Sequence, residues 1–397
     1  MTYDAAPNAG YLLLFSGSDG AIKVSYPSYN VSYGDTWTYR AGNWSKFSLP
    51  EYNNATAPLA RTYAAMSYYN HSGHRYVVLF GGQYGGPAGG FLRDTWIFNG
   101  NNWTNVTPSQ LNATNSPPAL YYPSMAWDPV DGYAVLYGGC TVSGCNYNPY
   151  VSNQTWAFEG LKGSGSNQQA QWVHLVTPVH PPGLYSPGLT FDNATGSLIL
   201  FGGVAVPSNG LLYTNQTWSY TAHTGWVNLT LPASHQSSGN TPPTRVWMTM
   251  AYDPTNQCIV LFGGQMNQSK LGNPTLGDTW IYSRGSWSNL TSSLSPSPHP
   301  RFGAVMAYDE SDDALVLFGG LSATLQHSPV LDDVWWYTGN PGAWVEKNGT
   351  AVTNPTSSPG LSPYVYAAVI VVAILVVAGV AIFLVRRRTR KGRGPIE

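Results

Sequence analysis

The chain has 397 residues, of which only 9% are charged, and it is rich in glycine (43), proline (30) and aromatic residues (14%). This composition is typical of turn-rich β-structure and excludes a helical bundle or a disordered chain. The formal net charge of -1 is unevenly distributed, because six of the 18 basic residues lie between positions 386 and 397. The remaining chain has 12 basic and 18 acidic residues, so nucleic acid is not an expected partner of that part.

One stretch, Met250 to Leu290, reads as a complete unit of four antiparallel strands. Met250–Tyr252 ends a first strand, and a tight turn leads to the apolar strand Cys258–Phe262, which a diglycine stops. After a polar loop, Asp278–Tyr282 alternates apolar and polar residues, as a half-buried strand does. Trp287 opens a fourth short strand. Such a sheet is too small to bury its own face alone, which predicts a repeated unit.

The same unit recurs six times, with a period of roughly 55 to 65 residues. Its apolar strand ends at Gly17, Gly82, Gly139, Gly203, Gly264 and Gly320. Its third strand carries a tryptophan at Trp37, Trp96, Trp156, Trp218, Trp280 and Trp335. A second tryptophan follows at Trp44, Trp103, Trp172, Trp226, Trp287 and Trp344. Proline-rich joints separate the copies, and the pattern predicts a radial array of six four-stranded blades.

The order of turn, hydrophobic strand, Gly-Gly, loop, tryptophan strand and second tryptophan resembles the kelch repeat. The resemblance covers nearly everything from Met1 to about Trp344. It implies an all-β, kelch-type β-propeller over residues 1–348, the domain shape also found in galactose oxidase. Kelch repeats carry many functions, so the fold alone narrows function only weakly.

The C-terminal part predicts a membrane anchor. A Pro/Ser/Thr stalk at 349–363 leads to an uncharged segment, 364–385, which is long enough to span a bilayer as a transmembrane helix. The basic tail at 386–397 is expected in the cytoplasm, which places the propeller outside the cell membrane of a single-pass protein. A buried core helix is the alternative interpretation. The sequence Pro359-Gly360-Leu361 before the helix also resembles the processed sorting signals of archaeal surface proteins.

The register of the repeats bears on the start of the chain. Met1 aligns with Met125, Met250 and Met306, each of which lies inside the innermost strand of its copy. No apolar signal segment precedes it, although the propeller is expected to be exported. The sequence therefore predicts that the native chain starts upstream of Met1, with a signal peptide and the rest of the strand, and that a seventh blade could precede it.

Two modifications are expected outside the cell. Asn-x-Ser/Thr motifs are frequent, which indicates a glycoprotein, although asparagine, serine and threonine are also common turn residues. Candidate glycosylation sites are Asn30, Asn43, Asn102, Asn153, Asn215, Asn267 and Asn289. Cys140 and Cys145 share one loop and are expected to form a disulfide, whereas Cys258 lies in an apolar strand and is expected in the core.

Candidate ligand-binding residues lie where the long loops gather. The connections between strands 2 and 3 and between blades are long, so one face of the propeller is expected to carry function. Tyrosines on these loops suit recognition of a protein or a sugar, and the candidates are Tyr84, Tyr147 and Tyr213. Arg61, Arg245 and Arg301 each precede an innermost strand, where Leu120 and Leu184 stand in two other copies. The resemblance to kelch domains implies that they bind an acidic ligand, and the alternative is an ion pair within the blade, for instance with the turn acid Asp309.

No catalytic or metal-binding motif is recognisable, and no cofactor is expected. The eight histidines are scattered, and no histidine or cysteine matches the copper ligands that the resemblance to galactose oxidase invites. The aspartates of the tryptophan strands are expected to bond local backbone N–H groups. The sequence thus favours a cell-surface binding module for an extracellular protein or glycan. The alternatives are an extracellular enzyme of the galactose oxidase-like class and a structural envelope protein.

Overall fold

The computed structural model describes residues 1–4, 10–18, 32–47, 56–85, 89–141, 145, 150–208, 210–232, 240–266, 274–322 and 330–347. The expected stalk, membrane helix and basic tail lie outside these residues. Within the described part, no helix is both long and apolar enough to cross a membrane.

The described residues form six four-stranded antiparallel sheets, as the repeats predicted. Blade 1 contains β1 (Thr2–Asp4), β2 (Tyr11–Ser18), β3 (Ser32–Arg40) and β4 (Asn43–Lys46). Blade 2 contains β5 (Ala65–His71), β6 (His74–Phe80), β7 (Thr95–Phe98) and β8 (Trp103–Asn105). Blade 3 contains β9 (Ser124–Asp128), β10 (Tyr133–Tyr137), β11 (Thr155–Lys162) and β12 (Gln169–Leu175).

The second half repeats the arrangement. Blade 4 contains β13 (Gly188–Asp192), β14 (Ser197–Phe201), β17 (Thr217–Thr221) and β18 (Gly225–Asn228), with the small hairpin β15 (Val204–Ala205) and β16 (Leu212–Tyr213) inserted. Blade 5 contains β19 (Thr249–Asp253), β20 (Cys258–Gln265), β21 (Thr275–Ser283) and β22 (Ser286–Asn289). Blade 6 contains β23 (Val305–Asp309), β24 (Ala314–Phe318), β25 (Val334–Thr338) and β26 (Ala343–Lys347). Two short 3₁₀ helices are η2 (Gly165–Asn167) and η4 (Thr291–Ser293).

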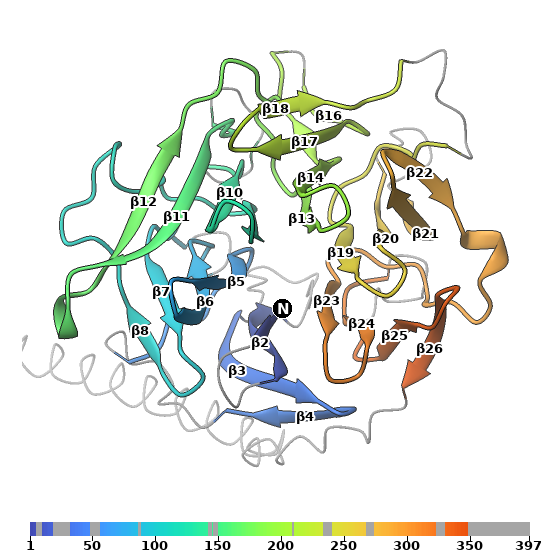
Figure 1. Cartoon of the computed structure of the whole chain (residues 1–397), viewed down its shortest axis with the longest axis horizontal. Helices are drawn as coiled ribbons and strands as arrows, with labels where there is room; N and C mark the ends of the chain where they lie inside the picture. Colours follow the sequence, from blue (N-terminus) through green and yellow to red (C-terminus); the bar gives the residue numbers. More distant parts are fainter. Residues whose placement is uncertain are drawn as a thin grey trace, which may run out of the picture. The chain divides into compact units, whose positions relative to one another are not determined.

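The six blades stand in a ring around a central axis (Figure 1). The first strands β1, β5, β9, β13, β19 and β23 lie innermost, and each contacts the first strand of the next blade. The ring closes where β1 contacts β23. The tight turns between strands 1 and 2 and between strands 3 and 4 lie on one side, here called the short-turn face. The connections between strands 2 and 3 and between blades lie on the other side, the long-loop face.

Tryptophans of the third strands occupy equivalent places in all six blades. Five are buried, at 1–6% exposure, and Trp37 is half-buried. Each indole N–H donates to the side chain two residues earlier, at 2.6–3.1 Å. The acceptor is Asp35, Asp94, Gln154, Gln216, Asp278 or Asp333. The equivalence that the repeats predicted is therefore present residue by residue.

The second tryptophan of each later blade connects it to the blade before. Its indole N–H donates to the hydroxyl of the threonine that precedes the third-strand tryptophan in the preceding blade, at 2.8–3.0 Å. The five donor–acceptor pairs are Trp103–Thr36, Trp172–Thr95, Trp226–Thr155, Trp287–Thr217 and Trp344–Thr279. These buried bonds fix the register between neighbouring sheets.

The contact between blades 6 and 1 differs. Val334 stands where the other blades have the accepting threonine, and among the described residues the buried indole N–H of Trp44 has no partner. Instead, Trp336 donates to the hydroxyl of Tyr39 at 2.8 Å across this junction. The ring is thus closed by a different hydrogen bond from the one repeated elsewhere.

Close contact between neighbouring blades explains why glycine is needed in the diglycines. At Gly81, with a φ of 67°, an added Cβ would lie 2.5 Å from the carbonyl oxygen of Leu120 in the next blade. At Gly138, with a φ of 75°, the same atom would lie 2.2 Å from the carbonyl oxygen of Leu184. Only glycine fits both the left-handed backbone and this approach.

Candidate binding face

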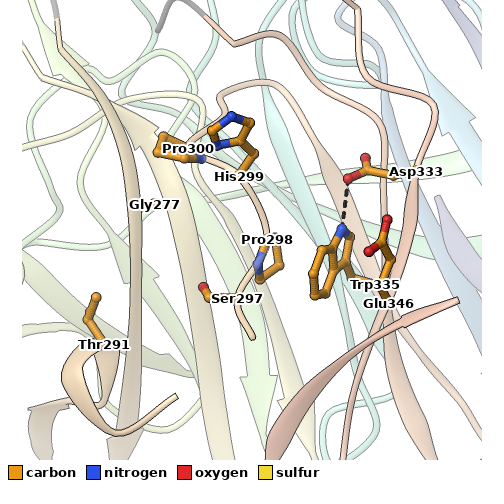
Figure 2. Close-up of a pocket in the computed structure, with 9 residues that line it drawn as sticks. All are labelled: Gly277, Thr291, Ser297, Pro298, His299, Pro300, Asp333, Trp335 and Glu346. Atoms are coloured by element: carbon orange, nitrogen blue, oxygen red, sulfur yellow. Dashed lines mark hydrogen bonds between the residues drawn. The ribbon is translucent and has the colours of Figure 1, made fainter. Parts of the chain in front are cut away.

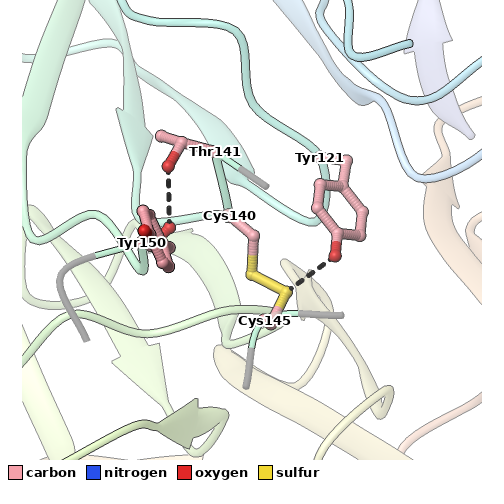
Figure 3. Close-up of a disulfide and its surroundings, with 5 residues drawn as sticks. All are labelled: Tyr121, Cys140, Thr141, Cys145 and Tyr150. Carbon is pink, nitrogen blue, oxygen red and sulfur yellow. Dashed lines mark hydrogen bonds between the residues drawn. A yellow bond between two sulfur atoms is a disulfide. The ribbon is translucent and has the colours of Figure 1, made fainter. Parts of the chain in front are cut away.

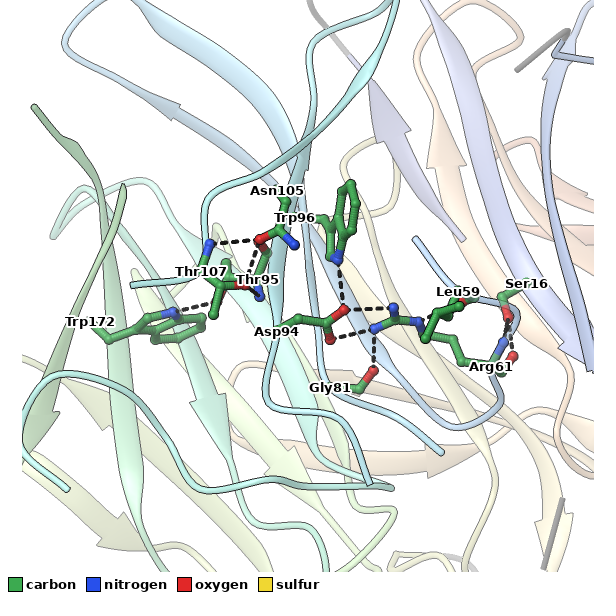
Figure 4. Close-up of polar contacts among 10 residues, drawn as sticks. All are labelled: Ser16, Leu59, Arg61, Gly81, Asp94, Thr95, Trp96, Asn105, Thr107 and Trp172. Carbon is green, nitrogen blue, oxygen red and sulfur yellow. Dashed lines mark hydrogen bonds and ion pairs between the residues drawn. The ribbon is translucent and has the colours of Figure 1, made fainter. Parts of the chain in front are cut away.

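The three candidate arginines lie at the starts of their blades, and each is buried at 0–1% exposure. Arg61 shows the shared geometry in Figure 4. Its Nη1 and Nη2 donate to the two carboxylate oxygens of Asp94 at 2.7 and 2.8 Å. Nη1 also donates to the carbonyl of Gly81 at 2.8 Å, and Nε donates to the carbonyl of Leu59 at 2.9 Å. Arg245 and Arg301 make the same bonds with Asp278 and Asp333.

These arginines therefore form an ion pair within the blade, and the partner is the aspartate of the tryptophan strand and not the expected turn acid. The expected turn acid, Asp309, lies on the short-turn face and pairs with backbone. The acids of the tryptophan strands were also expected to bond local backbone N–H groups, and Asp333 does accept its own backbone N–H. In blades 2, 5 and 6 these acids also accept a guanidinium and an indole N–H, which converge on them from the same blade.

The residue that occupies the position of Arg61 in a blade varies together with the residue two places before the third-strand tryptophan. Blades with arginine have aspartate at that second position, whereas Leu120 accompanies Gln154 and Leu184 accompanies Gln216. A neutral glutamine accepts the indole N–H without leaving a buried charge unpaired. Where arginine is present, the aspartate balances its positive charge. Burial alone would raise the pKa of Asp333, but the hydrogen bonds and charge of Arg301 outweigh it and lower that pKa.

Two residues beyond each arginine or leucine, the chain adopts a left-handed backbone in five blades. The positions are Tyr63, Tyr122, Ser186, Trp247 and Gly303, with φ between 48° and 68°. Backbone bonds connect them between blades 2 and 3, blades 3 and 4, and blades 5 and 6. The amide of Tyr122 donates to the carbonyl of Tyr63 and that of Ser186 to Tyr122, each at 3.0 Å. These residues therefore form a belt around the inner strands on the long-loop face.

Aromatic side chains from this belt converge across the axis. We call Tyr63, Tyr122, Trp247 and Phe302 the aromatic mouth. Tyr63 stacks on Tyr122 with ring centroids 4.0 Å apart, and Trp247 lies 5.6 Å from Phe302. Tyr122 and Trp247, which belong to the non-adjacent blades 3 and 5, are 6.1 Å apart. Among the described residues, the buried indole N–H of Trp247 has no hydrogen-bond partner.

Exposed aromatic side chains gather on the same face. Tyr33, Tyr63, Tyr84 and Tyr150 are 40–43% exposed. Tyr33 lies at the start of β3, Tyr84 and Tyr150 lie in 2–3 connections, and Tyr63 lies at the start of its blade. Of the candidate tyrosines, Tyr84 is thus exposed there. Tyr213 lies on β16 and is half-buried, and burial raises its pKa. Tyr147 lies outside the described residues.

The aromatic mouth was not among the features predicted from the sequence, although a signal was present. Tyr63 and Trp247 stand two positions after Arg61 and Arg245, and Tyr122 stands two after Leu120. The repeated spacing would have identified the belt once the arginine position was recognised.

The expected disulfide between Cys140 and Cys145 is present beside the mouth, with the two Cα atoms 5.8 Å apart (Figure 3). The hydroxyl of Tyr121 lies 3.0 Å from Sγ of Cys145 and is the donor, because a disulfide sulfur carries no proton. Thr141 holds the other side of the loop through the carbonyl of Tyr150, at 3.1 Å. The exposed Tyr150 is thus joined to the residue that follows the disulfide-bonded Cys140. Cys258 is buried on β20, as expected.

A hollow lies at the joint between blades 5 and 6 and has a volume of about 510 Å³ (Figure 2). Its lining includes Pro298, His299 and Trp335, together with the carboxylates of Asp333 and Glu346. Both oxygens of Asp333 already bind Arg301, so Glu346 is the one lining carboxylate outside that ion pair.

The candidate glycosylation sites divide by exposure. Asn43, Asn102, Asn153 and Asn289 are exposed and Asn215 is half-buried, while Asn30 and Asn267 lie outside the described residues. The fold requires the threonine of some of these motifs for its own hydrogen bonds. Thr155, the third residue of the Asn153 motif, is buried and accepts the indole N–H of Trp226. Part of the excess of motifs therefore arises from the blade architecture.

Within the described residues, no group of three or more histidine, cysteine, aspartate or glutamate side chains is arranged to hold a metal ion. No protein-family model matches the chain. Its fold is similar to that of a solved β-propeller, YjhT. The sequence identity is 15%, the TM-score is 0.55, and the alignment covers 79% of this chain and 90% of YjhT. At this identity, the likeness supports the propeller fold alone.

Proposed function

We propose that the propeller is a binding module that recognises an extracellular protein or glycan through the aromatic mouth and its surrounding tyrosines. The observation that carries the proposal is the gathering of Tyr33, Tyr63, Tyr84 and Tyr150, each 40–43% exposed, on one face. Tyrosine offers a large, rigid apolar ring and a hydroxyl at low entropic cost, which suits recognition surfaces.

The charge distribution supports the same face. The arginines closest to the mouth are neutralised by Asp94, Asp278 and Asp333, so they present no free charge to an approaching ligand. The hydroxyl groups of the exposed tyrosines offer neutral hydrogen-bond donors and acceptors to a ligand. Contact would then depend on aromatic rings and neutral hydrogen bonds rather than on ion pairs.

The remaining parts of the proposal concern context. The repeat pattern supports a kelch-type propeller, and the uncharged segment 364–385 followed by basic residues supports a cell-membrane anchor with the propeller outside. Exposed Asn43, Asn102, Asn153 and Asn289 are the sites at which glycans would attach. A ligand reached through the long-loop face would then be extracellular.

The test is capture of ligands by residues 1–348 on a glycan array and in pull-down from extracellular protein. Tyr63→Ala and Trp247→Ala should each weaken capture at least tenfold without a large change in the melting temperature. Val130→Ala is the matched control, because Val130 is 69% exposed on the short-turn face. Equal loss with the control, or unchanged capture with both mouth variants, would disprove the proposal.

The enzyme and envelope alternatives predict different results. Stoichiometric copper or another metal on the purified protein, with turnover of a captured sugar, would favour an extracellular enzyme of the galactose oxidase-like class. Absence of any captured glycan or protein, together with assembly of the chain into an ordered surface layer, would favour a structural role.

A further inference from the structure

The turns between strands 1 and 2 in blades 3 to 6 each begin with a buried aspartate, at 0–3% exposure. These residues are Asp128, Asp192, Asp253 and Asp309. One carboxylate oxygen, Oδ1, accepts backbone N–H groups of the same turn. In blade 3, for example, Val130 donates to Asp128 at 3.0 Å. This bond closes the turn on the short-turn face.

The second oxygen, Oδ2, depends on the residue three positions later. In blade 4, the hydroxyl of Thr195 donates to Asp192 at 2.8 Å. In blade 5, the amide nitrogen of Asn256 donates to Asp253 at 2.7 Å. Both buried carboxylates are thereby satisfied by a neutral donor from within their own turn.

Blades 3 and 6 have an acid at that position instead, Asp131 and Asp312. An ionised carboxylate has no proton to donate. Accordingly, Oδ2 of Asp128 and Oδ2 of Asp309 are buried and have no partner among the described residues, and the same holds for Oδ2 of Asp312. Asp131 and Asp312 are half-buried, and two neighbouring carboxylates of which one is buried cannot both ionise without a cost in free energy.

We propose that each of these acid pairs holds one shared proton, so that a protonated carboxyl group donates to its neighbour where blades 4 and 5 use threonine and asparagine. The proton is taken from solvent on acidification and returned to solvent as the pH rises, and no other bond changes. Below the titration range, a further hydrogen bond joins the two carboxyl groups. Above it, two negative charges face each other, one of them on a buried carboxylate.

The position of the pairs gives this titration a structural consequence. The second acid of each pair also contacts the next blade. In blade 4, the N–H of Ala222 donates to Asp131 at 2.9 Å. The N–H of Ala41 in blade 1 likewise donates to Asp312. In blade 5, Asn256 donates to the carbonyl of Gly339 in blade 6 at 2.8 Å. The two acid pairs therefore lie at junctions 3/4 and 6/1, which divide the ring into two halves of three blades.

The groups that face the first pair are tyrosines and one histidine. The hydroxyl of Tyr133 lies 3.3 Å from Asp131 and 3.3 Å from the hydroxyl of Tyr220. His71 of blade 2 lies against the same turn. Burial, with Asp131 beside it, raises the pKa of Asp128 from 3.8 to about 6. Because the folded-state pKa is the higher one, this group stabilises the fold below about pH 4 and loses that contribution as the pH rises through about 6.

The second pair faces Tyr39 of blade 1 and Lys347 of β26. Burial and the charge of Asp309 raise the pKa of Asp312, and Lys347 acts in the opposite direction. The pKa is raised here, as it is in blade 3, so the contact between the blades should be most stable at low pH at both junctions. The lysine should make the effect at junction 6/1 the smaller of the two.

The test uses the internal comparison between blades. The double variant Asp131→Asn, Asp312→Asn gives blades 3 and 6 the donor of blade 5, and Asn256→Asp gives blade 5 the acid pair of blade 3. Melting temperatures of the purified full chain are measured from pH 4 to 8. The wild type should lose on the order of 2–4 °C per pair between pH 4.5 and 7.5. The double variant should lose much less over that range, and Asn256→Asp should lose more than the wild type.

Hydrogen exchange provides the local readout. Amide exchange at Ala222 and Ala41 should accelerate with pH in the wild type, beyond the intrinsic chemical rate, and not in the double variant. Identical pH profiles for the wild type and both variants would overturn the proposal. So would stabilisation of the wild type alone by calcium at pH 7.5 and its reversal by EDTA, because a bound cation would then replace the proton.

Discussion

The ion pair between Arg245 and Asp278 allows the role of the arginines to be measured directly. Arg245→Leu removes four guanidinium hydrogen bonds of 2.6–3.1 Å, two of them to Asp278. Loss of one partner of a buried ion pair costs about 3–5 kcal/mol. Asp278 retains the indole N–H of Trp280 at 2.6 Å, and its side chain is 18% exposed. We therefore expect a cost of about 3 kcal/mol, at the lower end of that range.

The double variant Arg245→Leu, Asp278→Gln recreates the pair that blade 4 has at Leu184 and Gln216. It should recover most of the lost stability, because glutamine still accepts the indole N–H and no buried charge remains. A double-mutant cycle should thus give a coupling of about 2 kcal/mol.

Thermal melting of the propeller, residues 1–348, checks these values, with Arg75→Leu on the exposed part of β6 as the control. For a domain of about 350 residues, 3 kcal/mol corresponds to about 4 °C. An unchanged melting temperature for Arg245→Leu, combined with loss of ligand capture, would refute the structural role and restore the arginines as ligand-binding groups.

Three further measurements test the blade architecture and the disulfide. Val334→Thr supplies the acceptor that Trp44 lacks and should raise the free energy of unfolding by about 1 kcal/mol in chemical denaturation; no gain would mean that the hydroxyl cannot reach the indole. Trp280→Ala should cost about 3–5 kcal/mol in the same assay, and a loss below 1 kcal/mol would contradict its burial. Mass spectrometry without reduction should find Cys140 linked to Cys145 in protein folded under oxidising conditions, and two free thiols would contradict the disulfide.

Much of the propeller could be predicted from the sequence, because each blade is specified by local signals. Strand 2 is a continuous apolar run, the diglycine supplies two positive φ angles, and the third strand carries a buried tryptophan such as Trp96. These signals act within about ten residues of one another, so a repeat of the pattern indicates a repeat of the sheet.

The candidate site could be predicted only in part, because its partners are distant along the chain. The ion pair of Arg61 joins residues 33 positions apart, and nothing in the local sequence distinguishes Asp94 from a turn acid as its partner. The covariation of arginine with aspartate and of leucine with glutamine was readable, since it is a comparison between copies. The aromatic mouth depends on contact across the axis between blades 3 and 5, which no single repeat contains.

The central claim is that the long-loop face is the binding surface. Hydrogen–deuterium exchange in a ligand complex tests this claim most directly. The propeller is bound to the strongest ligand from the capture screen, and hydrogen–deuterium exchange is compared with the free protein. Protection should appear in the segments around Tyr63, Tyr122 and Trp247, while the short-turn segment that contains Val130 should exchange at the same rate in both states. Protection confined to the short-turn face, with no change around the aromatic mouth, would contradict the account.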